Sequence, residues 1–201
     1  MSSFDELRTT SLKERIRTLE ADLKASPMRH YIYHDLPFAI FCYPPEQEWA
    51  MRREIALLKT RLEKDTERQI VTLSLAGLMW QAVDDSEGSE VLVGLEQRSG
   101  FEAAQLQVQD YLSDPEWRPL PDLLAGRLGE LDPARHIAFI VRVSALAPNI
   151  YRVSKLLDEM QGRTRVPCVL FMPATTEGSS LRFMGIAENE GRGSYHTKVY
   201  A

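Results

Sequence analysis

The sequence predicts an α/β protein in which a mostly parallel sheet lies between layers of helices. Short apolar runs alternate with helical segments, and this order is typical of the crossovers that join parallel strands. The runs at 37–43, 136–143 and 166–172 are apolar almost throughout, as expected for strands buried on both faces. The 201 residues are enough for one domain with a sizeable core, and no linker divides them.

The first 26 residues are predicted to form an N-terminal helix. Ser3 and Glu6 have the spacing of a capping box. The apolar residues that follow recur at helical intervals until Pro27: Leu7, Leu12, Ile16, Leu19 and Leu23. The other face mixes charges of both signs, which favours a solvated helix over a nucleic-acid site.

Two strand–helix units are expected next. A strand at 37–43 is stopped by two prolines, and a helix at 46–64 is predicted to bury Trp49 together with Ile55, Leu58 and Leu62. A second strand at 69–75 leads into a helix at 76–83 with Trp80 on its apolar side.

Residues 84–133 lack a clear strand, so we expect a helical insertion on the sheet. Helices are predicted at 91–97, 101–111 and 120–128, and Gly88 and Gly100 flank the first of them. The β-branched run at 136–143 is the third strand, followed by a helix at 150–160.

The C-terminal part is predicted to complete the sheet. The strand at 166–172 is expected to end at Pro173, in a loop rich in hydroxyl groups. A fifth strand is expected at 181–185, and residues 186–201 are expected to form a tail that adds an edge strand at 195–200.

Composition restricts the classes of protein to which this chain can belong. The apolar fraction of 44% and the charged fraction of 26% are ordinary for a globular protein. Cys42 and Cys168 lie inside apolar runs, so we expect buried, reduced thiols. No apolar stretch reaches the roughly 18 residues of a membrane span, and the N-terminus does not resemble a secretory signal. A cytoplasmic protein without membrane contact is therefore expected.

The formal net charge of −5 is unevenly distributed. Residues 142–201 carry eight basic and five acidic side chains, a balance of +3, whereas the remainder carries −8. Scatter over solvated faces explains this pattern more simply than a basic edge for an anion or an acidic partner surface, and both interpretations remain open.

The motifs of common catalytic and cofactor sites are missing from the sequence. No glycine-rich phosphate loop follows a strand, and Pro44 and Pro45 occupy the turn where one would begin. His30 and His34 lie between two prolines and are interpreted as surface or satisfied loop residues rather than metal ligands. We therefore predict no catalytic residue, no metal and no cofactor.

Arginine and hydroxyl side chains at the predicted strand ends are the candidate binding residues. Arginine binds carboxylates and phosphates in a bidentate manner, so such an edge can hold an anion or a partner's acidic side chain. The alternative is that Arg142 and Arg182 make internal salt bridges and that the hydroxyl groups satisfy loop backbone. The strand-end group comprises Tyr43, Arg142, Ser144, Thr175, Thr176, Ser180 and Arg182, and the predicted partner-binding arginines are Arg142, Arg152, Arg163, Arg165 and Arg182.

The order of segments from Pro37 to Tyr200 resembles the BrxB family, which belongs to bacteriophage-exclusion (BREX) defence systems. The resemblance is most specific at YRVS (151–154), GRTRVP (162–167) and GSSLRFMG (178–185), and weakest across 84–133. It implies a non-catalytic component of an assembly that blocks phage replication while the host genome is methylated. The implied partners are a PglZ-type subunit, which is alkaline-phosphatase-like, an ATPase and a methyltransferase.

Two other functions remain open. A nucleic-acid-binding accessory protein would use Arg163, Arg165, Arg182, Arg192 and Lys198, although the sequence pI of about 5.5 opposes it. An enzyme acting on a phosphorylated small molecule has only the strand-end group in its favour.

For the partner contact, the candidate anchors are Arg152 and Arg182, with the helical block that bears Tyr111 and Trp117 as the alternative patch. The sequence does not indicate an oligomeric state.

The missing phosphate loop and ligand cluster lead to a first prediction. The isolated protein should not hydrolyse ATP, and calorimetry should detect neither nucleotide nor divalent-cation binding. A dissociation constant in the micromolar range for either ligand would contradict this prediction.

Overall fold

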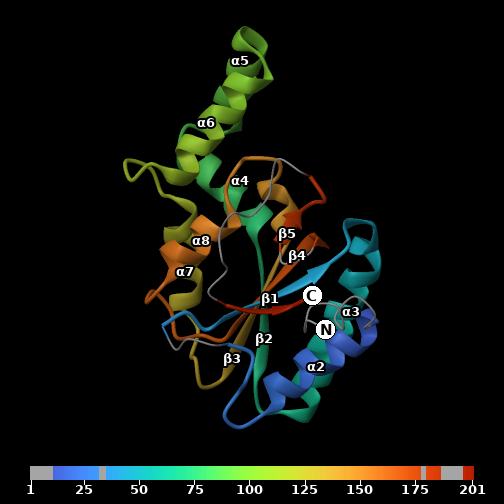
Figure 1. Cartoon of the computed structure of the whole chain (residues 1–201). Helices are drawn as coiled ribbons and strands as arrows, with labels where there is room; N and C mark the ends of the chain where they lie inside the picture. Colours follow the sequence, from blue (N-terminus) through green and yellow to red (C-terminus); the bar gives the residue numbers. More distant parts are fainter. Residues whose placement is uncertain (1–10, 32–34, 178–179, 187–196) are drawn as a thin grey trace.

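The computed structural model describes residues 11–31, 35–177, 180–186 and 197–201 (Figure 1). It has the predicted α/β architecture, built on a sheet of order β2-β3-β4-β1-β6 in which all neighbours are parallel. A further strand, β5, pairs with the end of β4 in antiparallel orientation. The strands are β1 (Phe38–Tyr43), β2 (Gln69–Ser74), β3 (His136–Val141), β4 (Cys168–Glu177), β5 (Ser180–Phe183) and β6 (Lys198–Tyr200).

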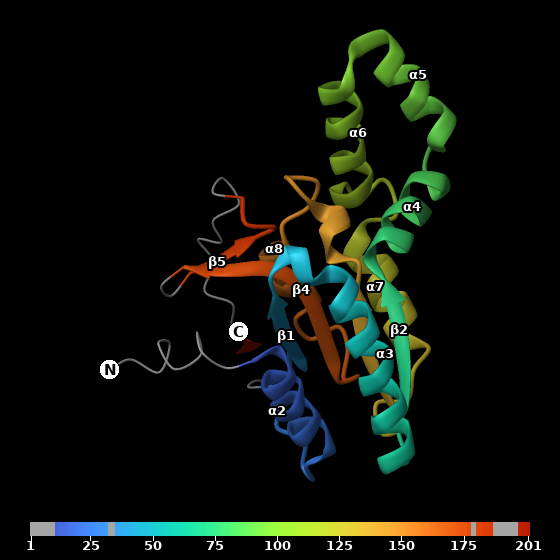
Figure 2. The same cartoon turned by 90° about the vertical axis from the view of Figure 1, so that its right-hand side faces the viewer.

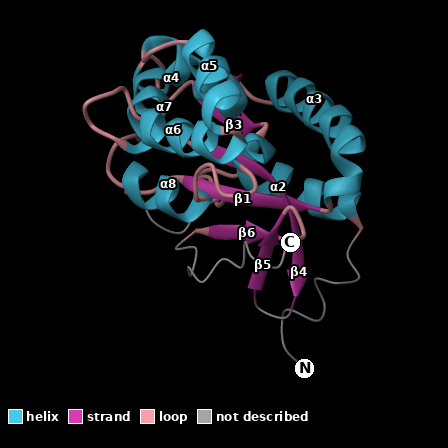
Figure 3. Cartoon of the chain, turned by 90° about the horizontal axis from the view of Figure 1, so that it is seen from above, coloured by secondary structure: helices cyan, strands magenta, loops and turns pink. Residues whose placement is uncertain are grey.

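Helices cover both faces of this sheet, which confirms the three predicted layers (Figure 3). One face packs against α2 (Leu12–Lys24) and α3 (Glu48–Asp65), and the other against α4 (Leu75–Asp85), α7 (Leu120–Gly129) and α8 (Val153–Met160). Two more helices, α5 (Ser89–Ser99) and α6 (Phe101–Ser113), form a hairpin that projects beyond the sheet (Figures 1 and 2). Short 3-10 turns, η1 (Pro45–Gln47) and η2 (Val143–Leu146), follow β1 and β3.

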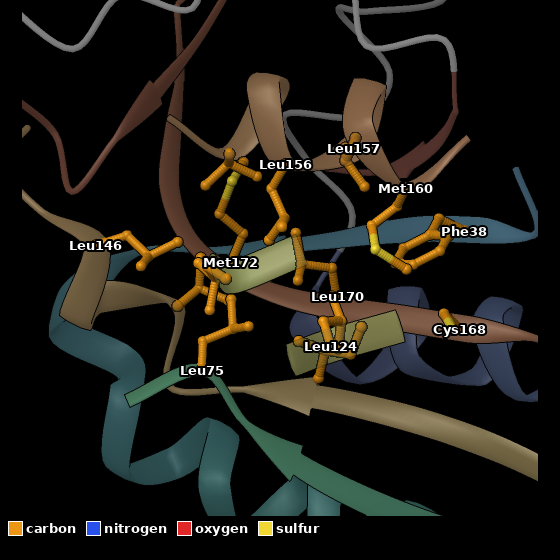
Figure 4. Packing of buried hydrophobic residues seen from close by; sticks show 14 of the residues in the cluster. Phe38, Leu75, Leu124, Leu146, Leu156, Leu157, Met160, Cys168, Leu170 and Met172 are labelled. Carbon is orange, nitrogen blue, oxygen red and sulfur yellow. The ribbon is translucent and has the colours of Figure 1, made fainter. Parts of the chain in front are cut away.

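The strands at the centre of the sheet supply two cores at once. Successive side chains of a strand point to opposite faces, so Phe38, Ile40 and Cys42 pack beneath α4, α7 and α8. Figure 4 shows this packing around Leu170 and Met172 of β4. The alternate residues Phe41 and Tyr43 pack against α2 and α3. Burying each large apolar side chain stabilises the folded state by about 1.5–3 kcal/mol. Both faces of the sheet therefore have to be covered by helices.

The helix that carries Ile16, Leu19 and Leu23 begins later than the sequence predicts. Ser11 has extended backbone angles and forms a capping box with Glu14, so α2 starts at Leu12. The capping box predicted at Ser3 and Glu6 lies outside the described residues.

Two tryptophans that the sequence predicts to be buried lie at the surface. Trp49 is 76% exposed and Trp80 is 53% exposed. The stripe that α3 buries runs instead through Met51, Leu58 and Leu62, with Ile55 partly buried between them. These four positions follow intervals of four, three and four residues along one helix face, and Trp49 lies off that face.

The predicted break at Pro173 is wrong, because β4 continues to Glu177. The parallel ladder with β1 ends at the Tyr43–Pro173 pair, so the missing N–H of proline interrupts no further bond there. Beyond it, β4 leaves the parallel sheet and pairs with β5, with Thr175 opposite Arg182. Residues expected in a loop are therefore part of a hairpin.

Asp22 of α2 connects the first helix to the last strand. Its carboxylate accepts hydrogen bonds from Lys198 Nζ at 2.6 Å and from the Tyr200 hydroxyl at 2.7 Å. Burial opposes ionisation, but these two donors hold the pKa of Asp22 below its ordinary value. The edge strand β6 is thereby fastened to α2 as well as to β1.

Replacing Asp22 with alanine should lower the free energy of unfolding by about 2 kcal/mol, since the Tyr200 hydroxyl loses its acceptor and the Lys198 ammonium keeps only the carbonyl of Arg29. Urea unfolding of the two proteins measures the difference. Asp65→Ala is the matched control, because Asp65 pairs with Lys24 at an exposed position and such pairs contribute little. Equal losses for the two variants would contradict the role given to Asp22.

Candidate functional site

A pocket lies where α3 crosses the carboxyl ends of the central strands. Its volume is about 260 Å³, and carboxyl ends of parallel strands are the usual location of binding sites in such folds. Phe171 and Val141 belong to its apolar lining, whereas Arg52, Lys59 and Arg142 bring positive charge to it. The remaining lining residues are Tyr43, Glu48, Ile55, Ala56 and Thr72.

The acidic side chain in this pocket, Glu48, is already occupied by internal partners. Its carboxylate accepts a hydrogen bond from the buried Tyr43 hydroxyl and another from Arg52 Nε at 2.7 Å. Burial and the bond to Glu48 raise the pKa of Tyr43, so the phenol keeps its proton. The Arg52 guanidinium in turn lies 4.6 Å from the ring centroid of Trp49. This chain of contacts holds the tryptophan in place at the surface.

Arg142 follows β3 in a conformation that L-residues rarely adopt. Its φ of 60° and ψ of 37° lie in the left-handed region, where a side chain other than glycine costs about 1–3 kcal/mol. Its side chain is exposed and, within the described part of the chain, makes no ion pair or side-chain hydrogen bond. Among the described residues, the fold thus holds an unpaired guanidinium in the lining of the pocket.

The five predicted partner-binding arginines do not form one group. Arg152 precedes the first turn of α8 and therefore lies at the same sheet edge as Arg142, since α8 returns from the end of β3 to the start of β4. Arg182 lies on β5, next to the extension of β4.

Arg163 and Arg165 precede β4 and lie at the opposite, amino-terminal edge. They do not share an edge with Thr175, because the length of β4 separates them. Arg163 pairs with Asp122 of α7 at 2.5 Å and is therefore engaged in an internal salt bridge.

Sequence reasoning missed Arg52, Lys59 and the exposed Trp49. The signal that identifies them is the spacing of α3, because a stripe that starts at Met51 leaves Trp49 outside the buried face. Tyr111, one member of the alternative patch, is fully buried and is excluded as a surface anchor. Trp117 is partly buried, with its ring centroid 5.3 Å from that of Tyr111.

The described residues contain no group of three metal-ligating side chains. As predicted, Cys42 and Cys168 are buried free thiols, and burial raises the pKa of Cys42 to about 12. Neither thiol is a nucleophile in this state. Across the same part of the chain, no helix combines the length and the apolar character needed to cross a bilayer.

His30 is buried, so of the two predicted alternatives, a surface residue or a satisfied loop residue, the first is wrong. Burial lowers the pKa of His30 to about 4, because the charged imidazolium loses its hydration. His34 and His196 lie outside the described residues.

Comparison with known proteins supplies the family. The sequence model of the BrxB family, described as BREX protein BrxB, matches residues 71–198. The chain belongs to the BrxB family. A BREX protein BrxB from Bacillus cereus (strain H3081.97) is 23% identical over 157 residues, which cover 76% of this chain and 78% of that protein. No solved structure matches the fold. Family membership makes this chain a component of a BREX phage-defence system.

The buried His30 predicts an acid-sensitive fold. The unfolded chain binds a proton at this histidine below a pH of about 6.5, whereas the folded protein does so only near pH 4, so stability falls as the pH is lowered between these values. Between pH 7 and pH 5, His30 should remove about 2 kcal/mol from the free energy of unfolding.

The variant His30→Gln stays neutral and should lose correspondingly less stability over this interval. Urea titrations of both proteins at the two pH values measure the difference. Parallel losses in the wild type and the variant would show that His30 is not the responsible group.

Proposed function

We propose that this chain is a non-catalytic interaction subunit that binds the PglZ-type subunit of its BREX system. The observation that carries the proposal is the carboxyl edge of the sheet, where Arg142, which has no ion-pair partner among the described residues, lines a small pocket. The exposed Trp49 lies against Arg52, another residue of that lining. Tryptophan and arginine are the residues most enriched among binding hot spots. Membership in a multi-protein defence system supports the same conclusion.

The chemistry of this edge favours binding over catalysis. The phenol of Tyr43 is held protonated by burial and by Glu48, and Glu48 itself is paired with Arg52. General-base and nucleophilic catalysis need a group that is free to accept a proton or to attack, and these side chains are not free to do so. A guanidinium without a partner instead suits a carboxylate or phosphate on another molecule.

The conformation of Arg142 provides a variant that tests binding without endangering the fold. Glycine adopts the left-handed region freely, so Arg142→Gly should leave the free energy of unfolding equal or slightly higher while removing the guanidinium. We expect affinity for the PglZ-type subunit to fall by at least about tenfold, and Trp49→Ala to act in the same direction. Calorimetry with the two purified subunits measures both effects.

Arg165→Gly is the matched control, because Arg165 is also exposed but lies at the opposite edge. It should bind as the wild type does. If the two wild-type subunits elute separately from a sizing column at micromolar concentration, the proposal is wrong. If the chain alone also shifts DNA, and this binding is lost at high salt, the nucleic-acid alternative replaces the proposal.

A further inference from the structure

The helical hairpin of α5 and α6 has features that play no part in the proposed binding edge around Arg142 and Trp49, which we call the arginine edge. Together with its flanking residues it spans 84–116, which we call the arm, and it projects away from the sheet (Figures 1 and 2). At its base the arm has an apolar cluster of its own, in which Val83, Leu92 and Tyr111 are buried. The Tyr111 hydroxyl also bonds to Glu87. The arm is therefore a packed structure and not an unsupported loop.

The arm carries the whole negative excess of the chain. Residues 84–116 contain nine carboxylates and one arginine, a balance of −8. Residues 1–83 carry twelve charges of each sign and residues 117–141 carry three of each, so both segments are neutral. Within the described residues, Asp85 is the one arm carboxylate in an ion pair, with Arg118 at 3.3 Å. The charge of the arm is thus almost wholly unbalanced within the molecule.

The same arm exposes large apolar side chains. Phe101 is 65% exposed, Leu106 60%, Val93 53% and Val91 40%. Val91 and Val93 are two residues apart, which sets them about 160° apart around α5. Exposed apolar side chains therefore point outward from the arm in several directions. A helix that is apolar on several sides is normally buried, so this exposure indicates a surface that becomes covered.

We propose that the arm is a docking element that inserts into a groove on another protein of the defence system, one with an apolar floor and a rim of lysine and arginine. A groove is required because a flat surface would cover only one side of the hairpin. A basic rim is required because the arm brings unpaired carboxylates next to its apolar residues, as at Glu90–Val91 and Phe101–Glu102.

The charge of the arm decides between classes of partner. Nucleic acid presents a dense array of phosphates, which would repel a segment of charge −8. Anionic membrane surfaces repel it for the same reason. A second copy of this chain presents an equally acidic arm, so arm-to-arm association is also opposed. A basic protein surface is the occupant that remains.

The test measures binding of this chain to each of the other proteins of its BREX system, purified singly. Two sets of changes address the two features of the arm. Phe101→Ser with Leu106→Ser removes exposed apolar groups, and should weaken binding to one of those proteins by at least about tenfold. Glu90→Gln, Glu96→Gln and Glu102→Gln together should slow association and flatten its dependence on salt.

Matched controls separate these effects from general ones. Trp80→Ser removes an exposed apolar side chain outside the arm, and Glu46→Gln, Glu67→Gln and Glu130→Gln together change the net charge by the same amount at exposed positions elsewhere. Both controls should bind as the wild type does. Since all the altered side chains are exposed, circular dichroism should report unchanged folding for every variant.

This inference stands apart from the arginine edge, and the variants report on each separately. Loss of binding in the arm variants, with binding retained in Arg142→Gly, supports the arm as a separate docking surface. If the arm variants bind every BREX protein as the wild type does, the arm is not a docking element. The proposal for the arginine edge is then unaffected. Binding of the wild type to none of these proteins would overturn both, and a change confined to self-association would reassign the arm to a second copy of the chain.

Discussion

The pairing of β1 with β4 is the interaction on which the rest of the structure depends. These strands come from opposite halves of the chain, and their ladder runs from Phe38–Cys168 to Tyr43–Pro173. All six residues of β1 are buried, because its alternate side chains enter different cores. A strand of this kind is stable only when helices cover both faces, so the positions of α2 and α3 on one side and of α4, α7 and α8 on the other follow from it.

The same pairing explains why the segment outside the family match belongs to the fold. The match begins at residue 71, yet β1 lies between β4 and β6 and completes the sheet. Asp22 adds a polar contact between α2 and β6, which holds the end of the chain against its beginning. Tyr43, Glu48 and Arg52, which form one side of the pocket, also come from this N-terminal segment. The candidate site is thus shared between the matched region and the part that precedes it.

Three buried titratable groups of this protein are neutral, in contrast to Asp22, whose partners keep it ionised. Burial keeps His30 and the thiols of Cys42 and Cys168 neutral. The charges without a partner among the described residues include Arg142 on the sheet edge and most carboxylates of the arm, and these lie at the surface. Charges of opposite sign are therefore presented at two separate places. Such a molecule is suited to contact more than one surface of an assembly, with each contact having its own salt dependence.

The sequence by itself determined the α/β class, the places along the chain where the strands occur and the burial of both cysteines. The spacing of apolar residues along a helix or strand reflects which of its faces is buried, so it can be read from the sequence. Only the tertiary structure decided the strand order, the continuation of β4 through Pro173, and which arginines share an edge. Arg163 and Arg142 look equivalent in the sequence, but the direction of β4 and of α8 sends them to opposite ends of the sheet. Exposure of Trp49 and the projection of the arm likewise depend on which helix faces find a partner, and that is a property of the packed chain.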